Sequence, residues 1–270
     1  MIDFNQIKLT DNYNLHTHTQ FCDGHAPMAE FVESAVDLGF DYLGFSPHSP
    51  ITFNTNCNMS FDSVADYFTE FDRLKSLYGD KIHLLKGMEV DYIDQWGPAS
   101  EYFTTLGLDY TIGSVHFLPS FDDASLYIDI DGSFERFKVK MHDFFHDDIV
   151  AVVKSFYEQS EKMIEKGGFD ILGHLDKVGM NASLYQPGID DEPWYDKLVK
   201  RLLDAVLDKH LTIEVNTKAW IKQQRFFPAS KYFSLIKKYN IPYVVNSDAH
   251  YPGLLNSGRM EAIKLLATAE

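Results

Sequence analysis

The sequence predicts an α/β fold in which seven parallel strands alternate with helices and close into a barrel. Short apolar segments and longer amphipathic segments alternate seven times along the chain, which is typical of strand–helix units. The short segments are almost continuously apolar, as expected for strands that helices cover on both faces. An open, doubly wound sheet is the alternative, because periodicity does not report whether a sheet closes.

The predicted strands are short apolar runs bounded by Gly, Pro and polar residues. They span residues 13–16, 41–46, 81–90, 110–117, 169–175, 211–216 and 241–247. The helices predicted after them show apolar residues at spacings of three and four. These helices span residues 27–38, 61–78, 99–106, 149–166, 192–209, 229–239 and 258–267. This order predicts one domain over residues 1–270.

One connection interrupts the alternation. Residues 119–148 (PSFDDASLYIDIDGSFERFKVKMHDFFHDD) are acidic and aromatic, and they are longer than an ordinary loop. Long connections of this kind often cover a binding site. We therefore predict a substrate-side insertion around 119–148 that contains some helix.

The composition limits the classes of partner. With 24 Lys and Arg against 40 Asp and Glu, the formal net charge is −16. Such a surface repels phosphate backbones and anionic lipids, so we predict neither a nucleic-acid nor a membrane partner. Divalent cations would reverse the potential inside a pocket, so a small phosphorylated substrate remains compatible with this charge.

The cysteines and the N-terminal segment bear on location. The chain has two isolated cysteines, Cys22 and Cys57, without the spacing of a disulfide framework. Residues 1–14 lack a basic stretch followed by an apolar one, and no apolar run is long enough to span a bilayer. These features predict a cytoplasmic protein.

Metal-ligand side chains lie at the carboxyl ends of most of the predicted strands. They are His16 and His18, His48, Glu89, His116, His174, Asn216, and Asp248 with His250. In a barrel of parallel strands the carboxyl ends open on one face, so these residues would meet there. Residues two apart point to the same side, and Gly24 allows the first loop to turn Asp23 or His25 back toward this face.

Imidazole and carboxylate ligands suit Zn, Mn or Fe, and the lack of paired cysteines argues against a structural Cys-based zinc site. A lone His-x-His pair is more often a surface or core feature than a metal site. Ligand residues at the ends of most strands are harder to attribute to solvated turns. The set therefore predicts a metal centre at the carboxyl face of the barrel.

These residues resemble the motifs of the PHP (polymerase and histidinol phosphatase) superfamily. The matching motifs are His16-Thr17-His18, Asp23-Gly24-His25, Ser46-Pro47-His48, Gly87-Met88-Glu89, Gly113-Ser114-Val115-His116, Gly173-His174 and Asn246-Ser247-Asp248-Ala249-His250. The chain looks most like the monofunctional L-histidinol-phosphate phosphatases of that superfamily. Its length, the long insertion and the stretch from Glu214 to Ser230 (EVNTKAWIKQQRFFPAS) support this narrower resemblance.

The resemblance implies a distorted (β/α)7 barrel and a trinuclear centre of three divalent metal ions. Carried over by position, the first ion would take His16, His18, Glu89 and Asp248. The second ion would share Glu89 and add His116 and His174, and the third would take His25, His48 and His250.

The resemblance also implies a phosphoric monoester hydrolase that converts L-histidinol phosphate to L-histidinol and phosphate in histidine biosynthesis. Closely spaced divalent ions generate a nucleophile from water and neutralise phosphoryl oxygens. We predict attack by a metal-bridging hydroxide beside Glu89. The leaving alkoxide would take its proton from Asp248 or His250.

Phosphate also requires protein cations. Arg225 is the first candidate, because a guanidinium makes paired bonds to phosphate oxygens; Lys218, Lys222, Arg259 and the strand-end Asn216 rank below it. The amine and imidazole of a histidinol-like substrate would suit the carboxylates or rings of Asp91, Tyr92, Asp94 or Trp220.

Three other functions remain open at this stage. They are a PHP-type phosphoesterase or nuclease with another substrate, an amidohydrolase or deaminase, and a metal-binding protein without catalysis. The sequence leaves open the oligomeric state and the identity of the metal.

Overall fold

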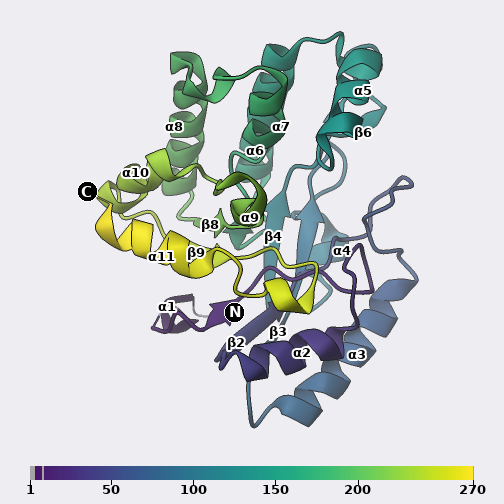
Figure 1. Cartoon of the computed structure of the whole chain (residues 1–270). Coiled ribbons are helices and arrows are strands. Elements are labelled where there is room, and N and C mark those ends of the chain that lie inside the picture. Colours follow the sequence, from purple (N-terminus) through teal and green to yellow (C-terminus); the bar gives the residue numbers. More distant parts are fainter. Residues whose placement is uncertain (1–3, 8, 270) are drawn as a thin grey trace.

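A computed structural model describes residues 4–7 and 9–269 and shows seven parallel strands in a nearly closed barrel wrapped by helices (Figure 1). Its sheet runs in the order β1-β2-β3-β4-β7-β8-β9. The strands are β1 (Tyr13–Asn14), β2 (Tyr42–Phe45), β3 (His83–Asp91), β4 (Tyr110–Ser114), β7 (Ile171–Leu172), β8 (Thr212–Asn216) and β9 (Tyr243–Asn246). The predicted fold class is confirmed.

Side-chain amides close the gap between the first and last strands. The Leu15 N–H donates to Asn246 Oδ1 at 2.9 Å, and the Ser247 N–H donates to Asn14 Oδ1 at 2.9 Å. Both asparagines are fully buried. Two amide side chains therefore supply hydrogen bonds between β1 and β9, where the backbones do not form a regular ladder. This irregular edge is the distortion of the barrel.

Beyond these asparagines the two chain segments come into direct contact. Thr17 and Ala249 form an isolated parallel bridge. The His18 N–H donates to the Ala249 carbonyl at 2.9 Å, and the Ala249 N–H donates to the His16 carbonyl at 3.1 Å. The segment with His16 and His18 therefore lies alongside the segment that carries Asp248.

Most predicted helices are present. The helices that follow strands are α2 (Met28–Asp37), α3 (Ser63–Tyr78), α4 (Glu101–Thr104), α6 (Ile149–Lys166), α8 (Pro193–Asp208), α10 (Phe233–Lys238) and α11 (Arg259–Thr268). Short elements α1 (Phe4–Ile7), α9 (Trp220–Gln223), η1 (Ile189–Asp191), η2 (Ser230–Tyr232) and η3 (Pro252–Leu254) complete the chain around them.

Helix α7 (Val178–Tyr185) was not predicted from the sequence. Its buried positions include Gly179 and Asn181 as well as Val178 and Ala182, so no apolar stripe marks it. An amphipathic stripe arises only where one face of a helix meets solvent. Its N-terminus follows His174 closely, and α7 therefore forms part of the rim of the site.

The segment 119–148 contains both a hairpin and a helix. Strand β5 (Phe117–Pro119) pairs antiparallel with β6 (Tyr127–Asp129), and α5 (Phe134–Phe145) follows. The Ser133 side chain accepts a hydrogen bond from the Arg136 N–H and caps α5. Phe137, Met141 and Phe145 are buried against the core, so this segment packs on the rest of the fold.

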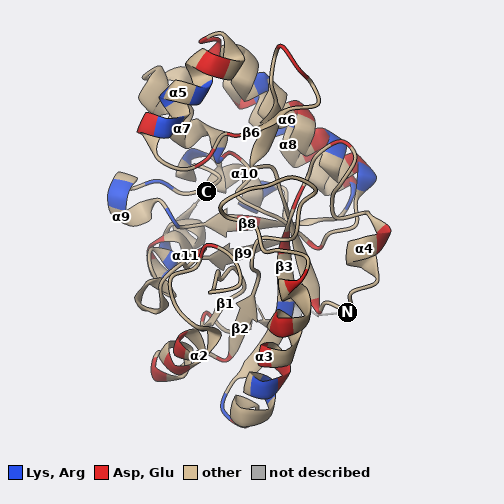
Figure 2. Ribbon diagram, turned by 90° about the vertical axis from the view of Figure 1, so that its right-hand side faces the viewer, with Lys and Arg blue, Asp and Glu red and all other residues tan. Residues whose placement is uncertain are grey.

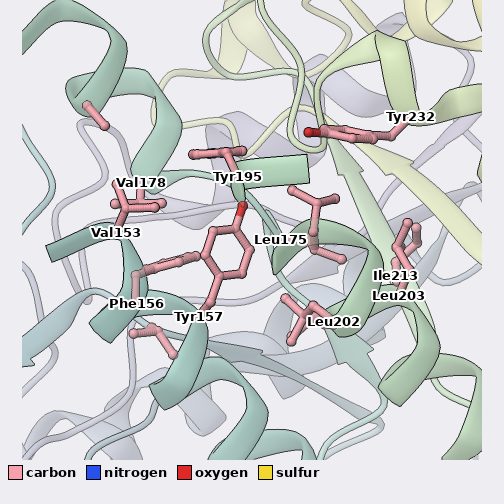
Figure 3. Packing of buried hydrophobic residues seen from close by; sticks show 14 of the residues in the cluster. Val153, Phe156, Tyr157, Leu175, Val178, Tyr195, Leu202, Leu203, Ile213 and Tyr232 are labelled. Carbon is pink, nitrogen blue, oxygen red and sulfur yellow. The ribbon is translucent and has the colours of Figure 1, made fainter. Parts of the chain in front are cut away.

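The largest core cluster lies where α6, α7 and α8 cover the later strands. Tyr157 packs among Phe156, Leu175 and Tyr195 (Figure 3), and the ring centroids of Tyr157 and Tyr195 are 5.7 Å apart. A second cluster lies under α2 and α3 on the other side of the sheet. Among the described residues, no helix is both long and apolar enough to traverse a bilayer.

Inside the barrel, one tyrosine fills the space between strands. The Tyr110 hydroxyl donates to the Leu15 carbonyl, and its ring lies against Gly44 and Gly87. A Cβ at Gly44 would lie 2.3 Å from the Tyr110 hydroxyl, and one at Gly87 would lie 2.4 Å from its ring. These two glycines therefore make room for the ring that plugs the barrel beneath the site.

Candidate metal centre

The first group of metal-ligand residues combines the two ends of the chain. His16 and His18 follow β1, and Asp248 follows β9. His18 Nε2 lies 3.1 Å from Asp248 Oδ1, and His16 Nε2 lies 3.8 Å from the same oxygen. All three side chains are buried, and one ligand atom of each fits within 4.8 Å of the others. The parallel bridge between Thr17 and Ala249 brings these two chain segments together and so produces this arrangement.

Glu89, at the carboxyl end of β3, lies at the centre of the site. Its Oε2 is 3.2 Å from His16 Nε2 and 3.2 Å from His48 Nδ1. Its Oε1 is 2.8 Å from His174 Nε2 and 3.5 Å from His116 Nε2. The structure therefore brings together residues that follow β1, β2, β4 and β7 around one carboxylate.

The third group contains a carboxylate that the sequence pattern left as an alternative. Asp23 Oδ1 lies 3.5 Å from His18 Nδ1, 3.8 Å from His48 Nε2 and 3.4 Å from His250 Nε2. These four residues form one of the groups that can hold an ion. Gly24 permits the turn, because a Cβ there would lie 2.3 Å from the backbone of the first loop.

His25, which the resemblance implied as a ligand, lies elsewhere. Its side chain is exposed and stacks on Tyr251, with ring centroids 4.4 Å apart. The structure does not bring it into any of the three groups found among the described residues. Its neighbour Asp23 occupies the corresponding place, and the Asp-Gly dipeptide was the sequence signal for that turn.

The donor atoms of this cluster fit divalent cations. The buried atoms without a hydrogen-bond partner in the described chain include His16 Nε2, His18 Nε2, His48 Nδ1, His174 Nδ1 and Asp23 Oδ1. A buried polar atom that finds no partner is costly. Imidazole nitrogens and carboxylate oxygens facing one another are also the donor set that Zn, Mn and Fe prefer. The cluster therefore fits metal ions better than it fits a metal-free interior.

Glu214 holds several of these residues in place. Its carboxylate accepts from His16 Nδ1 at 2.7 Å, the His174 N–H at 3.0 Å, Asn216 Nδ2 at 2.9 Å and Asn246 Nδ2 at 3.0 Å. Burial lowers the pKa of His16, yet Glu214 beside it raises that pKa well above its usual range. The hydrogen bond to Glu214 keeps a proton on Nδ1, so Nε2 is the nitrogen of His16 that would bind an ion.

Asp91 performs the same task for His116. Its Oδ1 lies 2.6 Å from His116 Nδ1, and its Oδ2 accepts from Asn58 Nδ2 at 2.6 Å. Burial lowers the pKa of His116, but Glu89 and Asp91 raise it to about 9. Asp91 holds a proton on Nδ1, so Nε2, which faces Glu89 and His174, is the nitrogen of His116 that would bind an ion.

The imidazoles of His18 and His174 are instead held in the neutral form. Burial and the nearby His250 keep the pKa of His18 well below its usual range. Burial and Lys177 lower the pKa of His174 to about 4. Neutral imidazoles present a lone pair, which metal coordination requires.

The carboxylates, in contrast, are ionised. Burial raises the pKa of Glu89, but His16 and the other imidazoles bring it well below its usual range. For Asp248 burial acts in the same direction, and Lys218 is the first of the groups that lower its pKa well below the usual value. The site therefore combines anionic carboxylates with two kinds of imidazole: the pKa values of His18 and His174 are lowered, and those of His16 and His116 are raised.

Two lysines lie near Asp248, one at each of its carboxylate oxygens. Lys218 Nζ lies 3.1 Å from Asp248 Oδ1 and 3.2 Å from His250 Nε2. Lys177 Nζ lies 3.9 Å from Asp248 Oδ2 and 2.9 Å from Asp131 Oδ2. Sequence reasoning included Lys218 but missed Lys177, although Lys177 follows a predicted strand end and so shares the signal that marked the histidines.

The two arginines among the candidate phosphate ligands have other partners. Arg225 lies 2.7 Å from Asp190 Oδ2 and 3.5 Å from Asp176 Oδ2. Arg259 is fully buried and donates to the Val245 and Asp11 carbonyls. Neither arginine contacts the histidine cluster in the ion pairs and hydrogen bonds of the described residues.

Asn216 lies inside the cluster, where its Nδ2 contacts Asp248 Oδ2 at 3.2 Å. Of the residues expected to meet the substrate amine, Asp91 borders the histidines. Asp94 instead pairs with Lys162 near the surface, at 3.2 Å. Trp220 lies in the short helix α9 and stacks on a neighbouring ring.

The chain belongs to the PHP domain family, whose model matches residues 14–218. A protein of Deinococcus radiodurans named "Probable histidinol-phosphatase" is 28% identical over 261 residues, covering 92% of this chain and 90% of that protein. The histidinol-phosphatase of Bacillus subtilis is 26% identical over 263 residues, covering 88% of this chain and 93% of that protein.

Solved structures show the same fold. The Listeria monocytogenes protein HisK superimposes with a TM-score of 0.79 at 22% identity, over 92% of this chain and 99% of that chain. Histidinol phosphate phosphatase from Lactococcus lactis, solved in complex with Zn, L-histidinol and phosphate, gives a TM-score of 0.69 at 18% identity, over 95% of this chain and 93% of that chain.

Proposed function

We propose that the chain is a metal-dependent phosphomonoesterase that hydrolyses L-histidinol phosphate to L-histidinol and phosphate. The observation that carries the proposal is the buried cluster of imidazole nitrogens around Glu89, several of them without a partner in the described chain. The relatives named as histidinol-phosphatases cover about nine-tenths of this chain and support the choice of substrate.

We propose that the cluster holds three divalent ions of Zn, Mn or Fe. The residues that would hold them are the groups His16, His18 and Asp248; His48, Glu89 and His116; and His18, Asp23, His48 and His250. His174 contacts Glu89 and would join the second group. Such ions, when bound, lower the pKa of water and neutralise phosphoryl oxygens.

The chain itself supplies groups that orient the ester. Lys177 and Lys218 flank Asp248, and their ammonium groups are suited to bind phosphoryl oxygens on this side of the cluster. Asp248 and His250 remain the candidates to hand a proton to the leaving alkoxide, and Nε2 of His250 lies 3.2 Å from Lys218 Nζ. Glu89 would act by holding the ligands together.

The surface charge supports a small substrate. Helix α2 carries Glu30, Glu33 and Asp37 and no Lys or Arg, as Figure 2 shows. With a net charge of −16, the chain would repel a polynucleotide at long range. We therefore infer a small phosphomonoester as substrate, and a cytoplasmic location is consistent with the two free cysteines.

The test is phosphate release together with metal content. Protein loaded with Zn or Mn should release phosphate from L-histidinol phosphate far faster than from an aryl phosphate, and the chelated protein should not. Glu89→Gln should lower kcat at least about 100-fold and reduce the amount of bound metal. Residues that ligate a metal, or that hold its ligands, strongly affect both metal affinity and activity. Glu161→Gln, a surface change on α6, is the matched control.

Comparable rates of phosphate release from both esters would contradict the assignment of L-histidinol phosphate as the specific substrate. Unchanged activity of Glu89→Gln would reject the metal-dependent mechanism. Degradation of single-stranded DNA in place of small esters would favour the nuclease alternative.

A further inference from the structure

The segment 119–148 places the carboxylate of Asp131 beside the metal cluster. Directly after β6, the Ile130 N–H donates to the His116 carbonyl at 2.9 Å. On its other side, Asn181 Nδ2 of α7 donates to the Ile130 carbonyl at 3.3 Å. The next N–H, of Asp131, is held by Asp129 Oδ1 at 2.7 Å. The backbone at Asp131 is therefore fixed between a strand end and α7.

The Asp131 side chain lies at the open side of the site. Its Oδ2 is 2.9 Å from Lys177 Nζ and 3.6 Å from His116 Nε2. The Asp131 side chain is 23% exposed, whereas that of Lys177 is 8% exposed and that of His116 is 4% exposed. The carboxylate is thus the most exposed member of this group of three.

The pairing of Asp131 with Lys177 would change if a phosphoryl group bound beside Lys177. Lys177 Nζ also lies 3.9 Å from Asp248 Oδ2, on the side of the cluster where the phosphoryl group is expected. A dianionic phosphoryl group competes with a single carboxylate for this ammonium. Asp131 would then be a partly buried carboxylate without a cation, which is unfavourable unless the ligand brings one.

We propose that Asp131 binds the ammonium group of the substrate and so selects phosphate esters that carry an amine two carbons from the ester oxygen. The proposal rests on the function proposed above and adds the residue that reads the amine. In such an ester the ammonium lies next to the phosphoryl group, just as Asp131 lies next to Lys177. One ammonium, that of Lys177, is exchanged for another, and the charge of the site stays balanced.

A purely structural role predicts a different outcome. If Asp131 only tethers Lys177, its removal misplaces a phosphate ligand and slows every ester by the same factor. If Asp131 binds the amine, its removal lowers kcat/KM for the amine-bearing ester and leaves the amine-free ester unaffected. The ratio of the two kcat/KM values therefore separates the roles.

The experiment compares L-histidinol phosphate with the imidazolylpropyl phosphate that lacks only the amine. For Asp131→Asn we expect the preference for the amine-bearing ester to fall about 10-fold to 100-fold, the usual range for losing a charged hydrogen-bond partner. Asp131→Glu should retain most of the preference. Asp122→Asn, which changes an exposed aspartate of the same segment that pairs with His146, should keep the wild-type ratio.

Equal losses on both esters with Asp131→Asn would overturn the proposal. Calorimetric binding of both esters to chelated protein gives a second readout that does not depend on hydrolysis. If wild-type protein hydrolyses neither ester, the proposed function fails, and an undiminished affinity of Asp131→Asn for the amine-bearing ester would also reject the role of Asp131. Circular dichroism of each variant excludes misfolding as the cause.

Discussion

At the scale of single residues, the site depends on groups that hold the ligand residues in place. Glu214 is fully buried and receives hydrogen bonds from four donors, among them His16 and the backbone of His174. Burial raises the pKa of Glu214, but His16 outweighs this and lowers it, so the carboxylate is ionised. Its two oxygens thus orient the imidazole of His16 and hold the backbone at His174.

Glu214→Gln should weaken metal binding about 10-fold to 100-fold, as is typical when the partner of a ligating histidine is changed. All four partners of Glu214 are donors, so the new amide N–H₂ necessarily faces a donor. Metal titration of the chelated protein measures the affinity. Glu161→Gln serves as the control, and equal affinities of the two variants would contradict this role.

The same scale explains why neighbouring residues differ in role. Asp23 faces three imidazoles, while His25, two positions later, stacks on Tyr251 at the surface. The loop after β1 has no regular period, so the sequence pattern named both and could not choose. The turn at Gly24 places Asp23, and not His25, toward the cluster.

At the scale of elements, Arg225 connects the loop after α9 to α7 and η1. Its guanidinium lies between Asp176, just before α7, and Asp190 of η1, and it donates to Ser183 of α7 at 3.2 Å. Asp176 is fully buried and needs this cation, since an unpaired buried carboxylate is costly. These contacts support the position of α7, whose N-terminus carries Lys177.

Arg225→Met should lower the free energy of unfolding by about 3 kcal/mol, near the lower end for loss of one partner of a buried ion pair. Urea denaturation of metal-loaded protein measures it. The control is Arg201→Met, an exposed arginine that pairs with Glu161, for which we expect about 1 kcal/mol or less. Unchanged stability with a raised KM for the phosphate ester would instead support the predicted role of Arg225 in phosphate binding.

At the scale of the whole molecule, the barrel is closed by two asparagines. Asn14 accepts from the Ser247 N–H, and its amide donates to the His16 carbonyl at 3.0 Å and to Thr17 Oγ1 at 3.0 Å. Closure therefore fixes the first strand end against the last one. We call this contact between the ends of β1 and β9 the seam. His16, His18 and Asp248 follow these two strands, so the metal cluster depends on the seam.

Asn14→Ala should lower the free energy of unfolding by about 1 to 3 kcal/mol, because it leaves the buried Ser247 N–H without a partner. Thermal unfolding with and without chelator measures the effect. Asn12→Ala, an exposed asparagine just before β1, is the matched control. A variant as stable as this control would show that the seam does not need the amide.

Much of this site was predictable because of its position in the fold. Parallel strands in a barrel carry their carboxyl ends to one face, so His16, Glu89, His116, His174 and Asp248 could be grouped from strand boundaries alone. The structure brings these residues together. Asp131 was not predicted, because it faces the site only after the segment 119–148 has packed. Lys177 was missed although it follows a predicted strand end.

The sequence by itself determined the alternation of strands and helices and the placement of metal-ligand residues at strand ends, because both follow from local periodicity. Only the tertiary structure decided which cations are free. Arg225 and Arg259 looked like phosphate ligands, but distant carboxylates and carbonyls engage them. The partner of a charged side chain comes from another part of the chain, and a linear pattern carries no record of that contact.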